Sequence, residues 1–207
     1  MRLPGREHWL AYLRFLSFFL AAFVPIYAGS GHLLAQLPDR SIPLHFAWEK
    51  DIPLVPWMIW PYLSLFSLYL LPLLHLSVEE MDRLARQSAL AVLVAGSMFV
   101  ALPTQAGFPP TAVTGLHEPL FRLIALVDTP FNLMPSLHVS GAALIVLGCC
   151  TARLGRRIAW VYRLWLALLA LSTVLVHQHH LIDVMAGFAL ALVVRHLVPL
   201  SGPCAGA

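Results

Sequence analysis

The chain has 207 residues, of which 59% are hydrophobic and only 11% are charged, and its formal net charge is +3. A soluble domain carries about a quarter charged residues, so this chain has too little polar surface to cover its apolar residues in water. The basic residues do not gather into a patch, so we expect a lipid bilayer and no nucleic acid as the partner.

Six apolar runs follow one another along the chain. We place them at about 9–34, 54–76, 87–103, 136–152, 158–178 and 181–199. Backbone groups inside a bilayer must be hydrogen bonded within the segment, so continuous apolar runs predict helices rather than barrel strands. The sequence therefore predicts an all-α fold, a six-helix transmembrane bundle that forms one domain over residues 1–207. The first run is too long for a signal peptide, and we interpret it as a retained span.

Most arginines fall on one side of six crossings. They lie before the first run, in the 77–86 and 153–157 loops, and near the end of the last run. By the positive-inside rule, we expect a multi-pass protein of the cell membrane with both termini cytoplasmic. The segments 35–53, 104–135 and 177–181 should then face outward.

The long loop at 104–135 carries a helical pattern of its own. Its apolar residues recur at helical spacing: Leu116, Leu120, Leu123, Ile124 and Val127. This spacing predicts a short amphipathic helix on the membrane surface, before the fourth span. A capping helix without a chemical role explains the pattern equally well.

Two polar clusters interrupt the apolar pattern at the outward ends of spans. The first reads Asn-Leu-Met-Pro-Ser-Leu-His over 132–138, and its Pro135-Ser136 pair predicts the start of a helix. The free N–H groups of such a helix start favour an anion. His138 lies in the same first turn and, when protonated, could donate a proton to a leaving oxygen.

The second cluster reads His-Gln-His-His-Leu-Ile-Asp over 177–183. Asp183 opens an otherwise apolar helix, and a carboxylate at that depth usually has a partner inside the bundle. His179 lies four residues earlier, where the carboxylate would hold one ring nitrogen and leave the other as a nucleophile or base. Simple capping of the helix by Asp183 is the alternative. Since both clusters face outward, we expect them to meet.

Pro-Ser-Leu-His at 135–138, followed by His179-x-x-x-Asp183, resembles the PAP2 phosphatase/phosphotransferase superfamily. The resemblance implies a six-helix membrane bundle that acts on phospholipids, isoprenoid phosphates or related phosphoesters, with no cofactor and no metal. It implies that His179 attacks phosphorus to form a phosphohistidine, that Asp183 orients His179, and that His138 protonates the leaving group. Ser136 and nearby backbone N–H groups would hold phosphate oxygens.

Three cations of the superfamily pattern are missing here. Ala95 and Leu102 stand where the first motif has Lys and Arg, and Thr173 stands where the third motif has Arg. The relaxed pattern resembles the inositol phosphorylceramide synthase-like branch, which transfers a phosphodiester group to an alcohol and would need fewer cations. Alternatively, the missing charge comes from nearby basic residues, for which the candidates are Arg122, His177 and His180.

Two other functions compete with this interpretation. The same histidines and Asp183 could ligate zinc or iron in a metalloenzyme. His-rich membrane oxygenases, however, need several histidine motifs on the cytoplasmic side, and this chain has one such motif, on the outer side. A non-enzymatic transporter or scaffold bundle could use them to relay protons. The sequence does not predict an oligomeric state.

Overall fold

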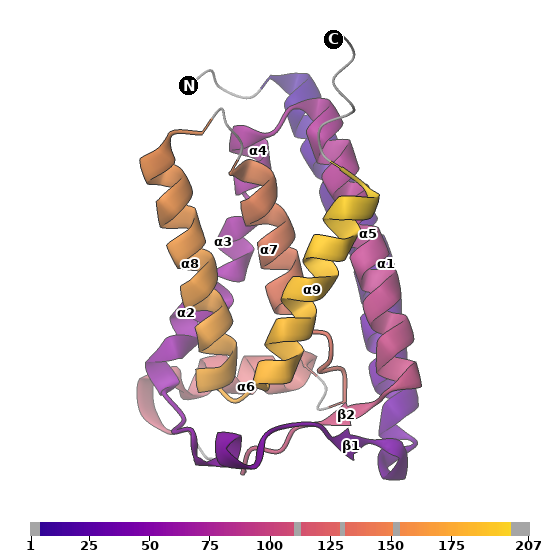
Figure 1. Cartoon of the computed structure of the whole chain (residues 1–207), viewed down its shortest axis with the longest axis vertical. Helices are drawn as coiled ribbons and strands as arrows, with labels where there is room; N and C mark the ends of the chain where they lie inside the picture. Colours follow the sequence, from indigo (N-terminus) through magenta and orange to yellow (C-terminus); the bar gives the residue numbers. More distant parts are fainter. Residues whose placement is uncertain (1–4, 110–112, 129–130, 151–153, 200–207) are drawn as a thin grey trace.

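The computed structural model describes residues 5–109, 113–128, 131–150 and 154–199, apart from the side chains of Pro38 and Val127. These residues are mostly helical (Figure 1). Three of the helices are long and apolar enough to cross a membrane: α1 (Arg6–Ala35), α5 (Val78–Ala101) and α8 (Arg156–Leu175). A helical membrane bundle is therefore supported, and the number of six spans stays a prediction.

The predicted second span is interrupted in the structure. It consists of η3 (Pro56–Met58), α2 (Ile59–Leu63), α3 (Leu65–Leu68) and α4 (Leu71–His75). The break between α2 and α3 lies at Ser64, whose hydroxyl donates to the Pro61 carbonyl. The break between α3 and α4 precedes Pro72, which has no N–H to donate to the carbonyl one turn back. Hydropathy does not register either interruption, because the residues on both sides are apolar.

Helix α5 begins at Val78 rather than near residue 87. The Ser77 hydroxyl accepts from the N–H of Glu80, and the Glu80 carboxylate accepts from the N–H of Ser77. This capping box starts the helix two turns before the apolar run, because its first turns carry charged residues that hydropathy excludes.

The long helices surround a central one. Helix α7 (Leu137–Cys149) is buried along most of its length and packs against α5, α8 and α9 (Leu181–Leu197). Figure 1 shows α1 and α5 running side by side. Gly96 of α5 permits their close packing, because a Cβ at this position would clash with the Ile26 side chain of α1.

The starts of α1 and α5 and the end of α9 lie at one end of the bundle (Figure 1). Arg14 of α1 forms a salt bridge with Asp82 of α5, and the Gln87 amide donates to the carbonyl of Val198 just after α9. The connections that carry the two polar clusters are therefore at the opposite end.

The opposite end is closed by short elements. They are η1 (Pro38–Arg40), β1 (Ile42–Pro43), η2 (Ala47–Asp51), β2 (Thr104–Gln105), η4 (Gly115–His117) and α6 (Glu118–Val127). Strands β1 and β2 pair in parallel, which the all-α prediction did not include because two residues are too few for an alternating pattern. Helix α6 lies across this end of the bundle (Figure 1), and the predicted short helix in this loop is confirmed.

Candidate active site

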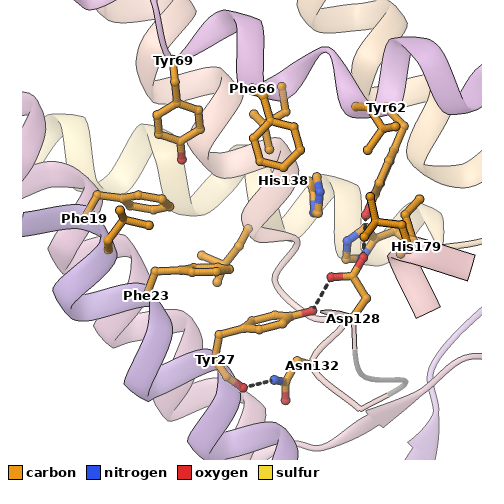
Figure 2. Close-up of a pocket in the computed structure, with 16 residues that line it drawn as sticks. Phe19, Phe23, Tyr27, Tyr62, Phe66, Tyr69, Asp128, Asn132, His138 and His179 are labelled. Atoms are coloured by element: carbon orange, nitrogen blue, oxygen red, sulfur yellow. Dashed lines mark hydrogen bonds between the residues drawn. The ribbon is translucent and has the colours of Figure 1, made fainter. Parts of the chain in front are cut away.

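His138 and His179 come together at the closed end of the bundle. His138 lies in the first turn of α7 and His179 in the turn before α9, and their ring centroids are 6.0 Å apart. Both side chains line a cavity of about 300 Å³ (Figure 2). The two clusters that the sequence places on the same side of the membrane thus form one site in the structure.

Ser136 joins the two helix starts. Its hydroxyl accepts from the N–H of Val139, which caps α7, and its own N–H donates to the carbonyl of Asp183 over 3.0 Å. The side chain of Ser136 is fully buried and does not line the cavity. In this structure Ser136 therefore fixes the distance between the histidine-bearing segments, and a direct contact with phosphate oxygens stays a prediction.

Gly187 makes the close approach of α7 and α9 possible. A Cβ at this position would lie 2.7 Å from the carbonyl oxygen of Ser136 and 3.2 Å from Cβ of Val139. We expect Gly187→Ala to lower the free energy of unfolding by about 1–3 kcal/mol, because backbone must move to admit the methyl group. Activity should fall as well, since the same shift displaces His138.

Thermal unfolding of the detergent-solubilised protein measures this effect. The matched control is Gly29→Ala in α1, where a Cβ meets nothing within 4 Å and alanine is the better helix former. Equal unfolding temperatures for the two variants would contradict the prediction.

Asp183 has two neighbours in the site. Its Oδ2 accepts from the N–H of His180 at 2.8 Å and lies 3.7 Å from Nδ1 of His179. The first contact is a capping bond, as the alternative interpretation of Asp183 anticipates. The second is too long for a hydrogen bond. Nδ1 of His179 and Oδ1 of Asp183 are both buried without a hydrogen-bond partner in the described part of the chain, and a shift of less than about 1 Å would join the ring to the carboxylate.

The cavity has an apolar body and a polar end. Its apolar lining comes from α1, α2, α3, α6 and α7: Phe19, Leu20, Phe23, Leu63, Leu65, Phe66, Tyr69, Leu123, Ile124 and Leu137. Its polar end comprises Tyr27, Tyr62, Asp128, Asn132, His138 and His179. No lysine or arginine is among the described residues that line it. Such a cavity suits a hydrocarbon chain that ends in a polar group of low charge.

Asp128 is a site residue that the sequence reasoning missed. Its carboxylate accepts from the hydroxyl of Tyr62 at 2.8 Å and from that of Tyr27 at 3.0 Å, while the Asn132 amide donates to the Tyr27 carbonyl (Figure 2). A signal was present: Asp128 is the only Asp, Glu, Lys or Arg between Arg122 and Arg153. Its partners Tyr27 and Tyr62 are distant in sequence, and no sequence motif links them to Asp128.

Arg122 lies away from the cavity. Its guanidinium is exposed and forms a salt bridge with Glu118 one turn earlier in α6. His177 also has another contact, because its Nε2 lies 3.0 Å from the carbonyl oxygen of Ile52 and its ring stacks on Phe108. Neither residue lines the cavity, so the structure gives no support for a contact of either one with phosphate.

His180 is buried and both of its ring nitrogens have protein partners. Nε2 accepts from the N–H of Gly107 at 2.9 Å, so Nδ1 must carry the proton and donate to Glu49 Oε2 at 3.0 Å. Glu49 also accepts from the N–H groups of Leu181 and Phe46. His180 therefore connects three loops, and it has no free nitrogen for the predicted contact with phosphate.

This connection should make the fold sensitive to acid. Burial lowers the pKa of His180, and the opposing effect of Glu49 does not offset it. Burial alone would raise the pKa of Glu49, but the N–H donors of Leu181 and Phe46 and the His180 ring together hold it below its usual value.

The unfolded chain thus binds both protons more readily than the folded protein does. We expect the free energy of unfolding to fall as the pH drops below 6.5, the usual pKa of histidine, and to fall further below 4.5, the usual pKa of glutamate. Thermal unfolding between about pH 7.5 and pH 4 measures this, and the slope should flatten in His180→Asn. An unfolding temperature that does not change with pH would contradict it.

In the part of the chain that the structure describes, no group of three or more His, Cys, Asp or Glu side chains is placed to hold a metal ion. The metalloenzyme alternative therefore has no geometric support from these residues.

Neither the curated proteins nor the solved structures gave a match to this chain. Residues 43–197, which include both histidines, Asp183, Asp128 and Tyr62, match the family model of the PAP2 superfamily. The chain therefore belongs to the PAP2 superfamily, whose members are generally phosphatases or phosphotransferases.

Proposed function

We propose that the protein is a membrane-embedded lipid phosphatase or phosphotransferase that works through a phosphohistidine on His179. The observation that carries this proposal is the pair of imidazoles, 6.0 Å apart, at the polar end of a cavity whose body is apolar. Superfamily membership supports the same reaction class.

The two histidines would divide the reaction between them. Nδ1 of His179 faces Asp183, so Nε2 is the nitrogen available to attack phosphorus. As the new P–N bond forms, the bond from phosphorus to the leaving oxygen breaks, and His138 gives its proton to that oxygen. In the second step water or an alcohol attacks phosphorus, His138 takes the proton of this nucleophile, and the P–N bond breaks.

The cavity supports a lipid as substrate. Its apolar body is lined mainly by residues of α1, α3 and α6, and it leads to the histidine pair. Figure 2 shows the aromatic rings of Phe19, Phe23 and Phe66 around it. A phospholipid or isoprenoid phosphate would place its hydrocarbon chain among the aromatic rings and its phosphorus at the polar end. The site would lie at the outer leaflet, with the starts of α1 and α5 on the cytoplasmic side.

Transfer to an alcohol is a second candidate for the same site. The described lining holds no Lys or Arg, and one carboxylate, Asp128, lies near the histidines. A phosphate monoester carries up to two negative charges and a phosphodiester one, so this lining favours the diester, as in an inositol-phosphate transferase. If a lipid phosphate monoester were hydrolysed faster than any diester is transferred to an alcohol, this candidate would fail.

Rapid-quench labelling tests the phosphohistidine. The purified protein is mixed with phosphorus-32 substrate, either a lipid phosphate monoester or a phosphodiester labelled in its transferred group. The protein-bound label should be lost in acid and retained in base, and peptide mapping should place it on His179. Absence of label during active turnover would overturn the proposed mechanism.

A further inference from the structure

A stacked tyrosine covers one face of His138. The ring centroids of Tyr62 and His138 are 4.4 Å apart and their planes are inclined by 25°. Tyr62 comes from α2, and only 1% of its surface is exposed. The imidazole at the start of α7 is therefore held against an aromatic face supplied by another helix (Figure 2).

The hydroxyl of this tyrosine is fixed by Asp128. Oδ2 of Asp128 accepts from Tyr62 at 2.8 Å, and Oδ1 accepts from Tyr27 of α1 at 3.0 Å. Each carboxylate oxygen thus has its own hydroxyl donor, from a different helix. Figure 2 shows the carboxylate between the two tyrosines, below His138 and His179. This arrangement places a negative charge at the same polar end of the cavity as the two imidazoles.

His138 needs such a charge if it is to act as an acid. A general acid must hold a proton before the leaving group departs. The start of α7 carries the positive end of the helix dipole, which opposes a cationic imidazole in the first turn. The second imidazole, His179, lies 6.0 Å away and gives no compensating charge. A carboxylate and the face of an electron-rich ring both stabilise a nearby cation.

We propose that Asp128 and Tyr62 are positioning residues for the reaction, which orient the His138 ring and stabilise its protonated form, the form that acts as the general acid. The inference rests on the proposed function, because it assigns His138 the proton that the leaving group receives. Tyr62 acts through the stack, Asp128 acts through its charge and through the Tyr62 hydroxyl, and Tyr27 holds the carboxylate in place.

Substrates with different leaving groups test this role. An alkyl phosphoester leaves as a poor alkoxide and needs the proton, whereas a p-nitrophenyl phosphoester leaves as a stable phenolate and does not. We expect Asp128→Asn to lower kcat/KM for the alkyl ester by about 10- to 100-fold, less than the full loss of an acid catalyst, and to change the aryl ester by less than about threefold. Tyr62→Phe should show the same selectivity to a smaller degree, because it keeps the ring and loses the hydroxyl.

The pH profile gives a second kinetic measurement. His138 must carry a proton, so kcat/KM for the alkyl ester falls as the pH rises through its titration. Without the Asp128 charge, the proton is held less tightly, and this fall should move to lower pH in Asp128→Asn. Asp39→Asn, at an exposed carboxylate in η1, is the matched control and should leave both profiles unchanged. Equal losses on both esters with an unmoved profile would show a purely structural role and overturn the proposal.

A titration without turnover separates this inference from the proposed function. The imidazole signals of ¹⁵N-histidine-labelled protein are followed by NMR, and the His138 signal is assigned by its loss in His138→Gln. His138 should keep its proton to higher pH in the wild type than in Asp128→Asn. Identical titrations would overturn the role of Asp128 even if phosphohistidine forms. A shifted titration in a protein that forms no phosphohistidine would instead refute the proposed function.

Discussion

Replacement of His179 by glutamine should reduce turnover of a lipid phosphoester on the order of 10⁴-fold or more. Glutamine keeps a polar side chain of similar length, but it has no nitrogen lone pair that can attack phosphorus. His179 is 6% exposed and lies in the cavity wall, so the loss should come from the chemical step rather than from unfolding. Turnover per mole of folded protein, with folding checked by thermal unfolding, is the measurement.

Two controls accompany this substitution. His32→Gln changes an exposed histidine of α1 and should leave turnover at the wild-type level. His179→Gly opens space for a free imidazole, and added imidazole should restore part of the activity. A His179→Gln protein that keeps substantial turnover with a shifted pH dependence would favour the proton-relaying transporter over the enzyme.

Replacement of Glu49 by alanine should lower the free energy of unfolding by about 3 kcal/mol. The carboxylate is fully buried and accepts from His180, Leu181 and Phe46. Its removal leaves the ring N–H of His180 and the N–H of Leu181 without an acceptor at the start of α9, and the N–H of Phe46 without one at the start of η2. Because Asp183 lies in the same first turn, we expect the distance between His179 and Asp183 to become variable and activity to fall with stability.

The size of the loss should depend on what replaces the carboxylate. Glutamine at position 49 keeps one oxygen, which can accept from His180 and Leu181, and turns its amide toward the N–H of Phe46. Glu49→Gln should therefore be less destabilised than Glu49→Ala. Glu7→Ala, at an exposed position of α1, is the matched control and should unfold like the wild type in detergent. An alanine variant as stable as this control would contradict the prediction.

The sequence could predict the meeting of His138 and His179, because it depends on the side of the membrane at which each cluster lies. It could predict α6 because the apolar spacing at 120–127 is regular over two turns. The interrupted second span was not predictable from hydropathy, since Ser64 and Pro72 alter hydrogen bonding without altering apolar character.

The partners of the site histidines were the least predictable part. His180 follows His179 in the chain, and the sequence alone does not show which of the two faces the cavity. That choice depends on Glu49, 131 residues away, which binds the ring of His180 and holds it away from the cavity. Asp128 and Tyr62 are likewise brought together only by the packing of α2 against the end of α6, a contact with no local sequence pattern.

The bond from the Ser136 N–H to the Asp183 carbonyl is made by main-chain atoms alone. Any residue except proline can donate it, and any residue can accept it. Substitutions at these two positions can therefore change the side chains of the site while the main-chain bond stays in place. That bond holds the start of α7 at a constant distance from the start of α9.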